Sequence, residues 1–150
     1  MYLSVELDAH HIQEIMSATS EDGVNWIPDA GVRIQNRVPG MLEVANNPSA
    51  LHHNGEVWLW FRGSDCMPLD SNIYVAQSKD GLVFSGIQKV LAYSKWRHHE
   101  RHGIAFPHVA ATEEGFRMYY AGYWGNWNCG KTVNYYRKIK KCRNAFVPQS

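Results

Sequence analysis

Three stretches of this 150-residue chain carry side chains whose types and spacing suit chemistry. They span residues 62–70, 93–102 and 122–129. Asp65 in the first and Glu100 in the second are carboxylates of the kind that transfer protons in catalysis, and the third is rich in aromatic rings that can line a sugar site. Because binding and catalytic residues concentrate on loops held by a rigid scaffold, these stretches form the candidate site.

An internal repeat supplies the elements that must position these loops. Residues 15–26 and 73–84 share Ile, Ala, Ser, Asp and Gly at an offset of 58, and both segments end on an aromatic residue. Residues 48–61 resemble residues 107–120 at an offset of 59 to 60. Two independent matches at nearly the same period indicate a repeated structural unit.

Tight-turn signals divide each unit into short strands. Glycine takes a positive φ without steric cost, and a preceding Asn or Asp bonds back to the local backbone. The signals are Asp22-Gly23, Asn54-Gly55, Asp80-Gly81 and Glu114-Gly115. Flanking runs such as 56–61 and 116–120 are β-branched and aromatic, and no segment keeps a helical period over three turns. The chain is therefore predicted to be all-β.

The predicted architecture is a partial β-propeller of about 2.5 four-stranded antiparallel blades, folded as a single domain over residues 1–150. An incomplete blade covers 1–34, a full blade 47–91 and a third blade 105–150. The predicted strands are 2–7, 12–20, 24–34, 47–53, 56–62, 72–78, 82–91, 105–112, 116–121, 132–138 and 145–147. Since antiparallel strands reverse at each turn, the tight turns fall on one face and the three chemical stretches on the other.

The repeated pattern resembles a known superfamily. It reads Pro-x-x-x-x-x-[Asn/Glu]-Gly-x-aromatic, followed by Ile-x-x-Ala-x-Ser-x-Asp-Gly-x-x-aromatic. This resembles the five-bladed β-propeller glycosidases, which include arabinanase-, xylosidase- and invertase-like hydrolases and mannoside phosphorylases, over most of residues 12–125. The resemblance implies cleavage of glycosidic bonds, with a catalytic Asp near the start of an innermost strand, often before a proline. Asn47 and Phe106 occupy the matching positions, and neither can act as a base.

Two functions from different classes follow. The first is a glycosidase-like carbohydrate-active protein, a glycoside hydrolase if it is an enzyme, whose site is completed by oligomerisation. The alternative is a non-catalytic carbohydrate-binding or assembly module derived from a glycosidase propeller, or a truncated copy of a larger enzyme without activity. Whether the chain is an enzyme therefore stays open at this point.

The candidate catalytic residues are Asp65 and Glu100, because glycoside hydrolysis needs two carboxylates roughly 5–9.5 Å apart. Asp65 has an alternative role as a turn former, and Glu100 as a solvated ion-pair partner of the neighbouring arginines. The candidate substrate-binding residues are Asn47, Arg62, Trp96, His108, Tyr123, Trp124 and Trp127. Three further tryptophans on strands, Trp26, Trp58 and Trp60, are predicted to pack between blades.

Composition narrows the classes of partner that the sequence predicts. With 15 basic and 14 acidic residues the formal charge is +1, so nucleic acid is not a predicted partner. No run approaches membrane-spanning length, and residues 1–7 lack a signal-peptide pattern, which predicts a cytoplasmic protein without a membrane partner. The three cysteines show no Cys-x-x-Cys spacing and are predicted to be free thiols.

No metal or cofactor is predicted, because the chain contains neither a recognised metal-ligand spacing nor a phosphate-binding glycine loop. The predicted partners are carbohydrate and a second copy of the chain. The reason for the second copy is that an incomplete propeller leaves strand edges open to pairing, which favours a homo-oligomer and most simply a symmetric dimer.

Overall fold

The computed structural model of the chain describes residues 1–7, 12–36, 41–42, 44–65, 70–123 and 140–142. Within these ranges the regular secondary structure consists of β-strands alone, so the all-β prediction is confirmed. The same ranges contain no helix long and apolar enough to cross a membrane.

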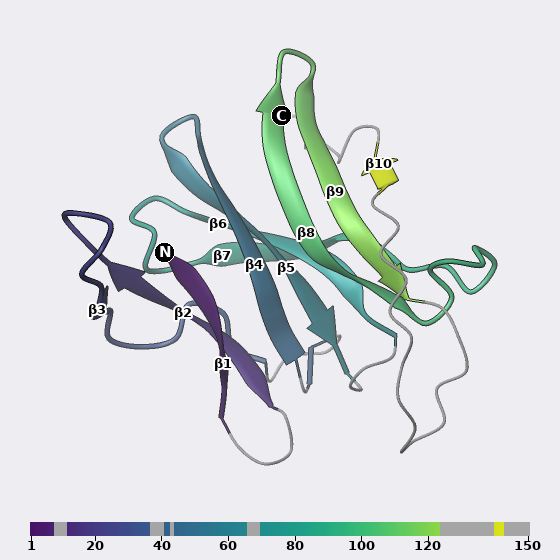
Figure 1. Cartoon of the computed structure of the whole chain (residues 1–150), viewed down its shortest axis with the longest axis horizontal. Helices are drawn as coiled ribbons and strands as arrows, with labels where there is room; N and C mark the ends of the chain where they lie inside the picture. Colours follow the sequence, from purple (N-terminus) through teal and green to yellow (C-terminus); the bar gives the residue numbers. More distant parts are fainter. Residues whose placement is uncertain (8–11, 37–40, 43, 66–69, 124–139, 143–150) are drawn as a thin grey trace.

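The described strands form two sheets (Figure 1). One has the order β1-β2-β4-β5-β6-β7, with β3 beside β2, and the other has the order β10-β9-β8. The bounds are β1 (Tyr2–Glu6), β2 (Gln13–Thr19), β3 (Ile27–Pro28), β4 (Val44–His53), β5 (Glu56–Ser64), β6 (Asn72–Ser78), β7 (Ser85–Leu91), β8 (Gly103–Thr112), β9 (Gly115–Tyr123) and β10 (Lys140–Cys142). Strands β4 to β7 form an uninterrupted antiparallel meander, whereas β2 meets β4 at a single parallel bridge.

The prediction of a long strand at 24–34 is wrong, because only a short strand forms there. The chain bends through residues 21–25, forms β3 over two residues, and returns to β2 at an isolated bridge between Ile34 and Ile15. Pro28 ends the short strand because it has no backbone N–H to donate to the ladder. The strand predicted at 82–91 likewise starts later, at Ser85, since the preceding corner extends through Val83.

Two other predicted strands, 132–138 and 145–147, lie outside the described residues. The strand that pairs with β9 on its second side is β10, in antiparallel register with Lys140 opposite Tyr120. The remaining predicted strands correspond to observed strands, and the strand predicted at 72–78 has the bounds of β6.

The central strands β5 and β6 are covered on both faces. Leu59 and Phe61 of β5 enter one apolar cluster with Ile15 of β2, whereas Trp60 enters a second cluster with Met118 of β9. Alternate side chains of a strand point to opposite faces, so this division places β5 between two packed neighbours. The sheet of β8, β9 and β10 therefore packs on one face of β5, and β2 contributes to the cluster on the other face.

The two Asp-Gly corners adopt the same local structure. Ser20 Oγ accepts the Gly23 N–H at 2.9 Å, and Asp22 Oδ1 accepts two backbone N–H groups at 2.8 Å. In the second corner Ser78 Oγ accepts the Gly81 N–H at 2.9 Å, while Asp80 Oδ1 accepts the backbone N–H groups of Leu82 and Val83. The aligned segments thus share their hydrogen bonds as well as their residue types.

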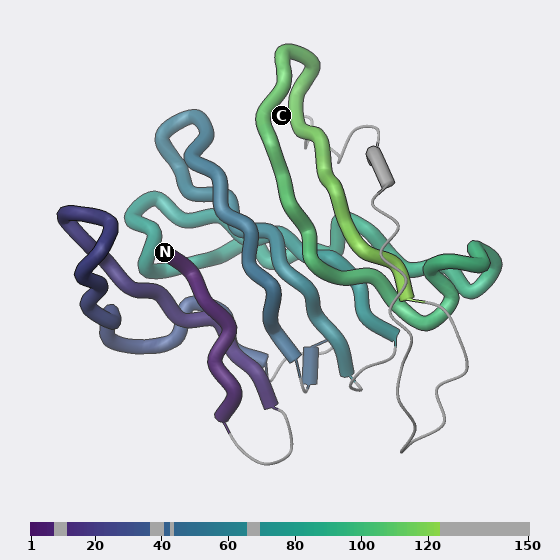
Figure 2. Tube along the Cα trace, in the orientation of Figure 1, coloured from purple at the N-terminus to yellow at the C-terminus, as the bar shows by residue number. Residues whose placement is uncertain are grey.

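Both corners lie on the same side of the molecule, at the left of the view in Figures 1 and 2. The phenol of Tyr2 donates to the Gly81 carbonyl at 2.8 Å, and the Arg33 guanidinium donates to the Leu82 carbonyl at 2.9 Å. These bonds join the first unit to the corner of the second. They hold the two units in a fixed relation on the side remote from the candidate loops.

Candidate functional site

The ends of β5 and β9 and the loop between β7 and β8 carry several of the predicted site residues and lie away from the hairpin turns (Figure 1). Asn47 is near the start of β4, His108 lies in the middle of β8, Asp65 directly follows β5, and Tyr123 ends β9. The hairpin turns at 54–55 and 113–114 stand at the opposite end. Trp124 and Trp127 lie outside the described residues.

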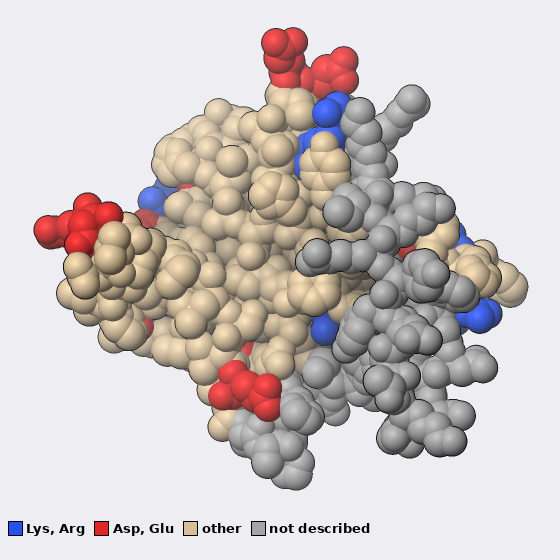
Figure 3. Space-filling view, viewed as in Figure 1, with Lys and Arg blue, Asp and Glu red and all other residues tan. Residues whose placement is uncertain are grey.

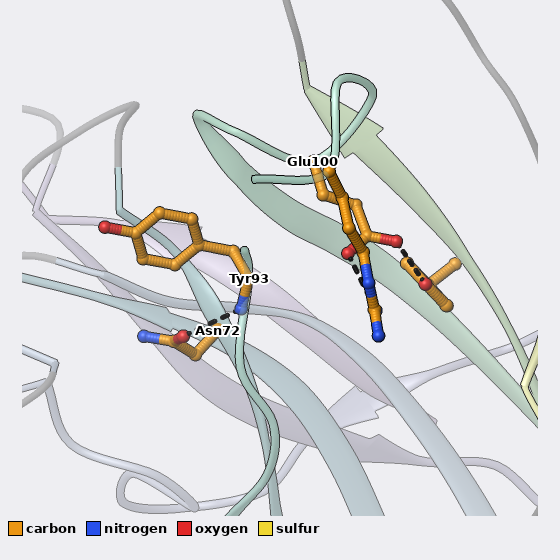
Figure 4. Close-up of polar contacts among 5 residues, drawn as sticks. Asn72, Tyr93 and Glu100 are labelled. Carbon is orange, nitrogen blue, oxygen red and sulfur yellow. Dashed lines mark hydrogen bonds and ion pairs between the residues drawn. The ribbon is translucent and has the colours of Figure 1, made fainter. Parts of the chain in front are cut away.

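Residues 70–72 connect the loops at this end. The Asp70 N–H donates to the His102 carbonyl at 3.0 Å, and Ser71 Oγ donates to the Ile104 carbonyl at 2.9 Å. Asn72 Oδ1 accepts the Tyr93 N–H at 3.2 Å (Figure 4). Burial, together with hydrogen bonding to the Asp70 carboxylate, raises the pKa of Tyr93 to about 12, so this phenol stays protonated at neutral pH.

Glu100 is buried, with 1% of its surface exposed, and its carboxylate forms an ion pair with Arg97. The predicted ion pair with a neighbouring arginine is therefore confirmed, but the prediction that Glu100 is solvated is wrong. One carboxylate oxygen accepts the Tyr120 hydroxyl at 2.6 Å, and the other accepts Arg97 Nη1 at 3.2 Å (Figure 4). Buried carboxylates persist where they are paired and hydrogen-bonded. Glu100 therefore anchors the loop before β8 against β9, and both of its oxygens are occupied.

Arg62 and Tyr123, both predicted to bind substrate, contact each other. The guanidinium carbon of Arg62 lies 5.7 Å from the centre of the Tyr123 ring, which is cation–π distance. Both side chains are buried. They consequently belong to the packed interior beneath this end of the sheets.

Asp65 and Trp96 are exposed instead. One Asp65 carboxylate oxygen accepts the Leu42 N–H at 3.0 Å. The Trp96 side chain is 97% exposed, on the loop between β7 and β8. Trp26 is also more exposed than predicted, at 42%, because its indole N–H reaches back to the Gly23 carbonyl instead of packing inward.

The starts of β4 and β8 show a feature that the sequence did not predict. Asn47 and Phe106, each directly before a proline, have φ values of 51° and 52°. Ser49 Oγ accepts the Val109 N–H at 3.2 Å, so the two strands lie side by side just beyond the prolines. His108 is exposed on the same stretch of β8. The equivalent Asn-Pro and Phe-Pro spacing was the available signal for this shared geometry.

A surface hollow of about 390 Å³ lies at the other end, at the Asp22 corner. Its two aspartates are already hydrogen-bonded, Asp22 to backbone N–H groups and Asp29 to the hydroxyls of Ser17 and Thr19. These bonds lower the pKa of both groups and leave them structural. Over the described part of the chain no three His, Cys, Asp or Glu side chains are grouped to hold a metal ion.

The charged side chains visible in Figure 3 lie mainly at the rim of the molecule. Acidic groups cover the tip of the β8–β9 hairpin, where Glu113 and Glu114 form the turn, and the corner beside β3. Much of the described surface between these groups is uncharged in this view.

Comparison with known proteins identifies a solved structure with a similar fold. No protein-family model matches the sequence, and no curated protein matches it. Among solved structures the chain is similar to Zg3597, a family 117 glycoside hydrolase produced by the marine bacterium Zobellia galactanivorans, with a TM-score of 0.60 and 18% sequence identity. The match covers 73% of this chain and 34% of that chain, so the present chain spans about a third of its neighbour.

At this level of identity the match shows a shared fold. The chain is an all-β protein with a partial propeller-like fold of the kind found in a glycoside hydrolase. The predicted all-β, partial-propeller fold class is thereby confirmed, and the number of blades stays a prediction.

Proposed function

We propose that this chain is a carbohydrate-binding protein built on a glycosidase-like scaffold, with its site at the starts of β4 and β8. The observation that carries the proposal is the Ser49–Val109 hydrogen bond, which brings the stretches of β4 and β8 that carry Asn47 and His108 side by side. An amide and an imidazole can both donate to and accept from sugar hydroxyls. The fold shared with a glycoside hydrolase supports carbohydrate as the ligand class.

Binding without hydrolysis fits the described residues best. Hydrolysis by the usual route needs two carboxylates flanking the scissile bond. Glu100 is buried with both oxygens engaged, and the pre-proline positions hold Asn47 and Phe106, which are not acids. Asp65 is left as the exposed candidate among the carboxylates predicted to be catalytic.

The test of binding is a glycan array followed by titration of the glycans that bind. We expect binding by the wild-type chain and weaker binding by His108→Ala. His52→Ala is the matched control, because His52 is also exposed but lies at the far end of β4 beside the hairpin turn. Equal losses in the two variants, or no glycan bound by the wild type, would count against the proposal.

Hydrolysis is the second candidate function, and the exposed Asp65 carboxylate held by the Leu42 N–H favours it. Turnover of a broad panel of aryl glycosides that disappears in Asp65→Asn, but persists in Glu113→Gln at the opposite turn, would establish it. If the wild type turns over none of the panel, carbohydrate binding without hydrolysis is the function that stays proposed.

We also propose that the chain assembles with a second copy. Among the described residues β1 forms a ladder on one side only, with β2. A strand edge without a ladder is a template for pairing with another chain. Light scattering after gel filtration is expected to show a dimer, and a stable monomer over a wide concentration range would contradict this.

A further inference from the structure

Asn47 and Phe106 hold a backbone conformation that most residues avoid. Their φ values of 51° and 52° are left-handed, where the β-carbon crowds the following carbonyl. Asn tolerates this region better than other residues, whereas a bulky side chain such as Phe is a true outlier there. A residue before proline is in addition biased toward extended conformations. Phe106 is therefore the more strained of the two.

The same local irregularity surrounds both residues. The β4–β5 register shifts between Asn46 and Ser49, and the β8–β9 register shifts between Ala105 and His108. Such bulges re-aim a side chain relative to the sheet. Because the Val109 N–H bonds to Ser49 Oγ, the two bulges lie next to each other.

The bulges present groups suited to one kind of ligand. Phe106 keeps 47% of its surface exposed although it lies within a strand, and His108 is exposed two residues further on. The Asn47 N–H is held by Ser4 Oγ at 2.9 Å. The Asn47 side-chain oxygen is buried, so it does not face the solvent side of this surface.

Strained residues persist where the surroundings hold them, and they cluster at functional sites. We propose that Phe106 is the aromatic platform on which a neutral sugar ring stacks at this site. This inference rests on the carbohydrate-binding function proposed above. An exposed apolar ring selects a saccharide unit with an uncovered apolar face.

Calorimetric titration with arabino-, xylo- and manno-oligosaccharides tests the platform. Covering the exposed half of a Phe ring corresponds to roughly a tenfold change in Kd. Phe106→Ala and Phe106→Gly are both expected to weaken binding by about this factor, and Phe106→Trp to restore it. Trp26→Ala, which removes a partly exposed ring at the remote corner, is expected to leave affinity unchanged.

The same variants test the strain independently of any ligand. Glycine normally destabilises a strand relative to alanine, but at a left-handed position the order reverses. Phe106→Gly is therefore expected to melt about 2–4 °C above Phe106→Ala. The opposite order would remove the physical basis of the inference.

The outcomes separate the two proposals. Wild-type affinity in both Phe106 variants would overturn the platform and leave carbohydrate binding standing. A wild-type chain that binds none of these oligosaccharides, nor any glycan on the array, would overturn the proposed function and the platform with it.

Discussion

Gly122 in β9 lies where the loop before β8 crosses the strand, and this contact is open to a direct test. A methyl group added at Gly122 would overlap the backbone carbonyl oxygen of His99 and approach Glu100 Cγ to 3.1 Å. A backbone carbonyl cannot rotate aside as a side chain can, so the loop itself must move. Movement of the loop weakens the bonds that Glu100 makes to Tyr120 and Arg97.

The magnitude follows from these two effects. Overpacking of a tight site costs about 1–3 kcal/mol, and a hydrogen bond to a charged group contributes about 1.5–3 kcal/mol. Partial loss of both predicts that Gly122→Ala lowers the free energy of unfolding by about 3 kcal/mol, which is roughly 6–12 °C in Tm for a chain of this size. Gly23→Ala, where the added methyl meets nothing within 4 Å but φ is +74°, should cost only about 1 kcal/mol.

Thermal and urea unfolding followed by circular dichroism measures both variants. The double variant Gly122→Ala, Glu100→Gln should lose less stability than the sum of the single variants, because both changes act on the same contact. A Gly122→Ala protein with the wild-type Tm, or strictly additive losses, would refute this account of the loop.

Two further predictions concern the corner at Asp80 and the core at Trp60. Bonds from the Val83 and Leu82 N–H groups lower the pKa of Asp80 from 3.8 to about 2. The contribution of the ionised Asp80 carboxylate to the free energy of unfolding is therefore full above the unfolded-state pKa and is lost as the pH falls toward 2. Asp80→Asn should consequently flatten the acidic part of a plot of stability against pH. Trp60→Ala removes a fully buried ring and should cost about 3–5 kcal/mol in urea unfolding. Trp96→Ala, at an exposed ring, should change stability by less than about 0.5 kcal/mol.

The sequence predicted the parts of the fold that depend on local chemistry. Ser-x-Asp-Gly forms its corner from hydrogen bonds within four residues, so Ser20 and Ser78 could be read without knowledge of the rest of the chain. The strand 72–78 was likewise marked by its own residues and by turns on either side. The separation of the ends of β5 and β9 from the tight turns followed from the reversal of antiparallel strands at each turn.

The site depends on contacts that local patterns do not contain. Glu100 lies in the loop before β8, and it is buried against Tyr120, which comes twenty residues later on β9. The sequence neighbours of Glu100 do not reveal this contact, and they pointed to a solvent-exposed side chain instead. The left-handed backbone of Phe106 is equally invisible to propensity, since Phe is among the residues least suited to it. The shortness of β3 reflects the return of the chain at Ile34 to pair with Ile15, a tertiary contact.

The most direct test of the proposed site is an NMR titration of the ¹⁵N-labelled chain with the same arabino-, xylo- and manno-oligosaccharides. The account predicts that chemical shifts change first at residues 46–49 of β4 and 105–109 of β8, while the corners at Asp22 and Asp80 stay constant. Shifts confined to those corners, or a spectrum unchanged by every oligosaccharide, would contradict it.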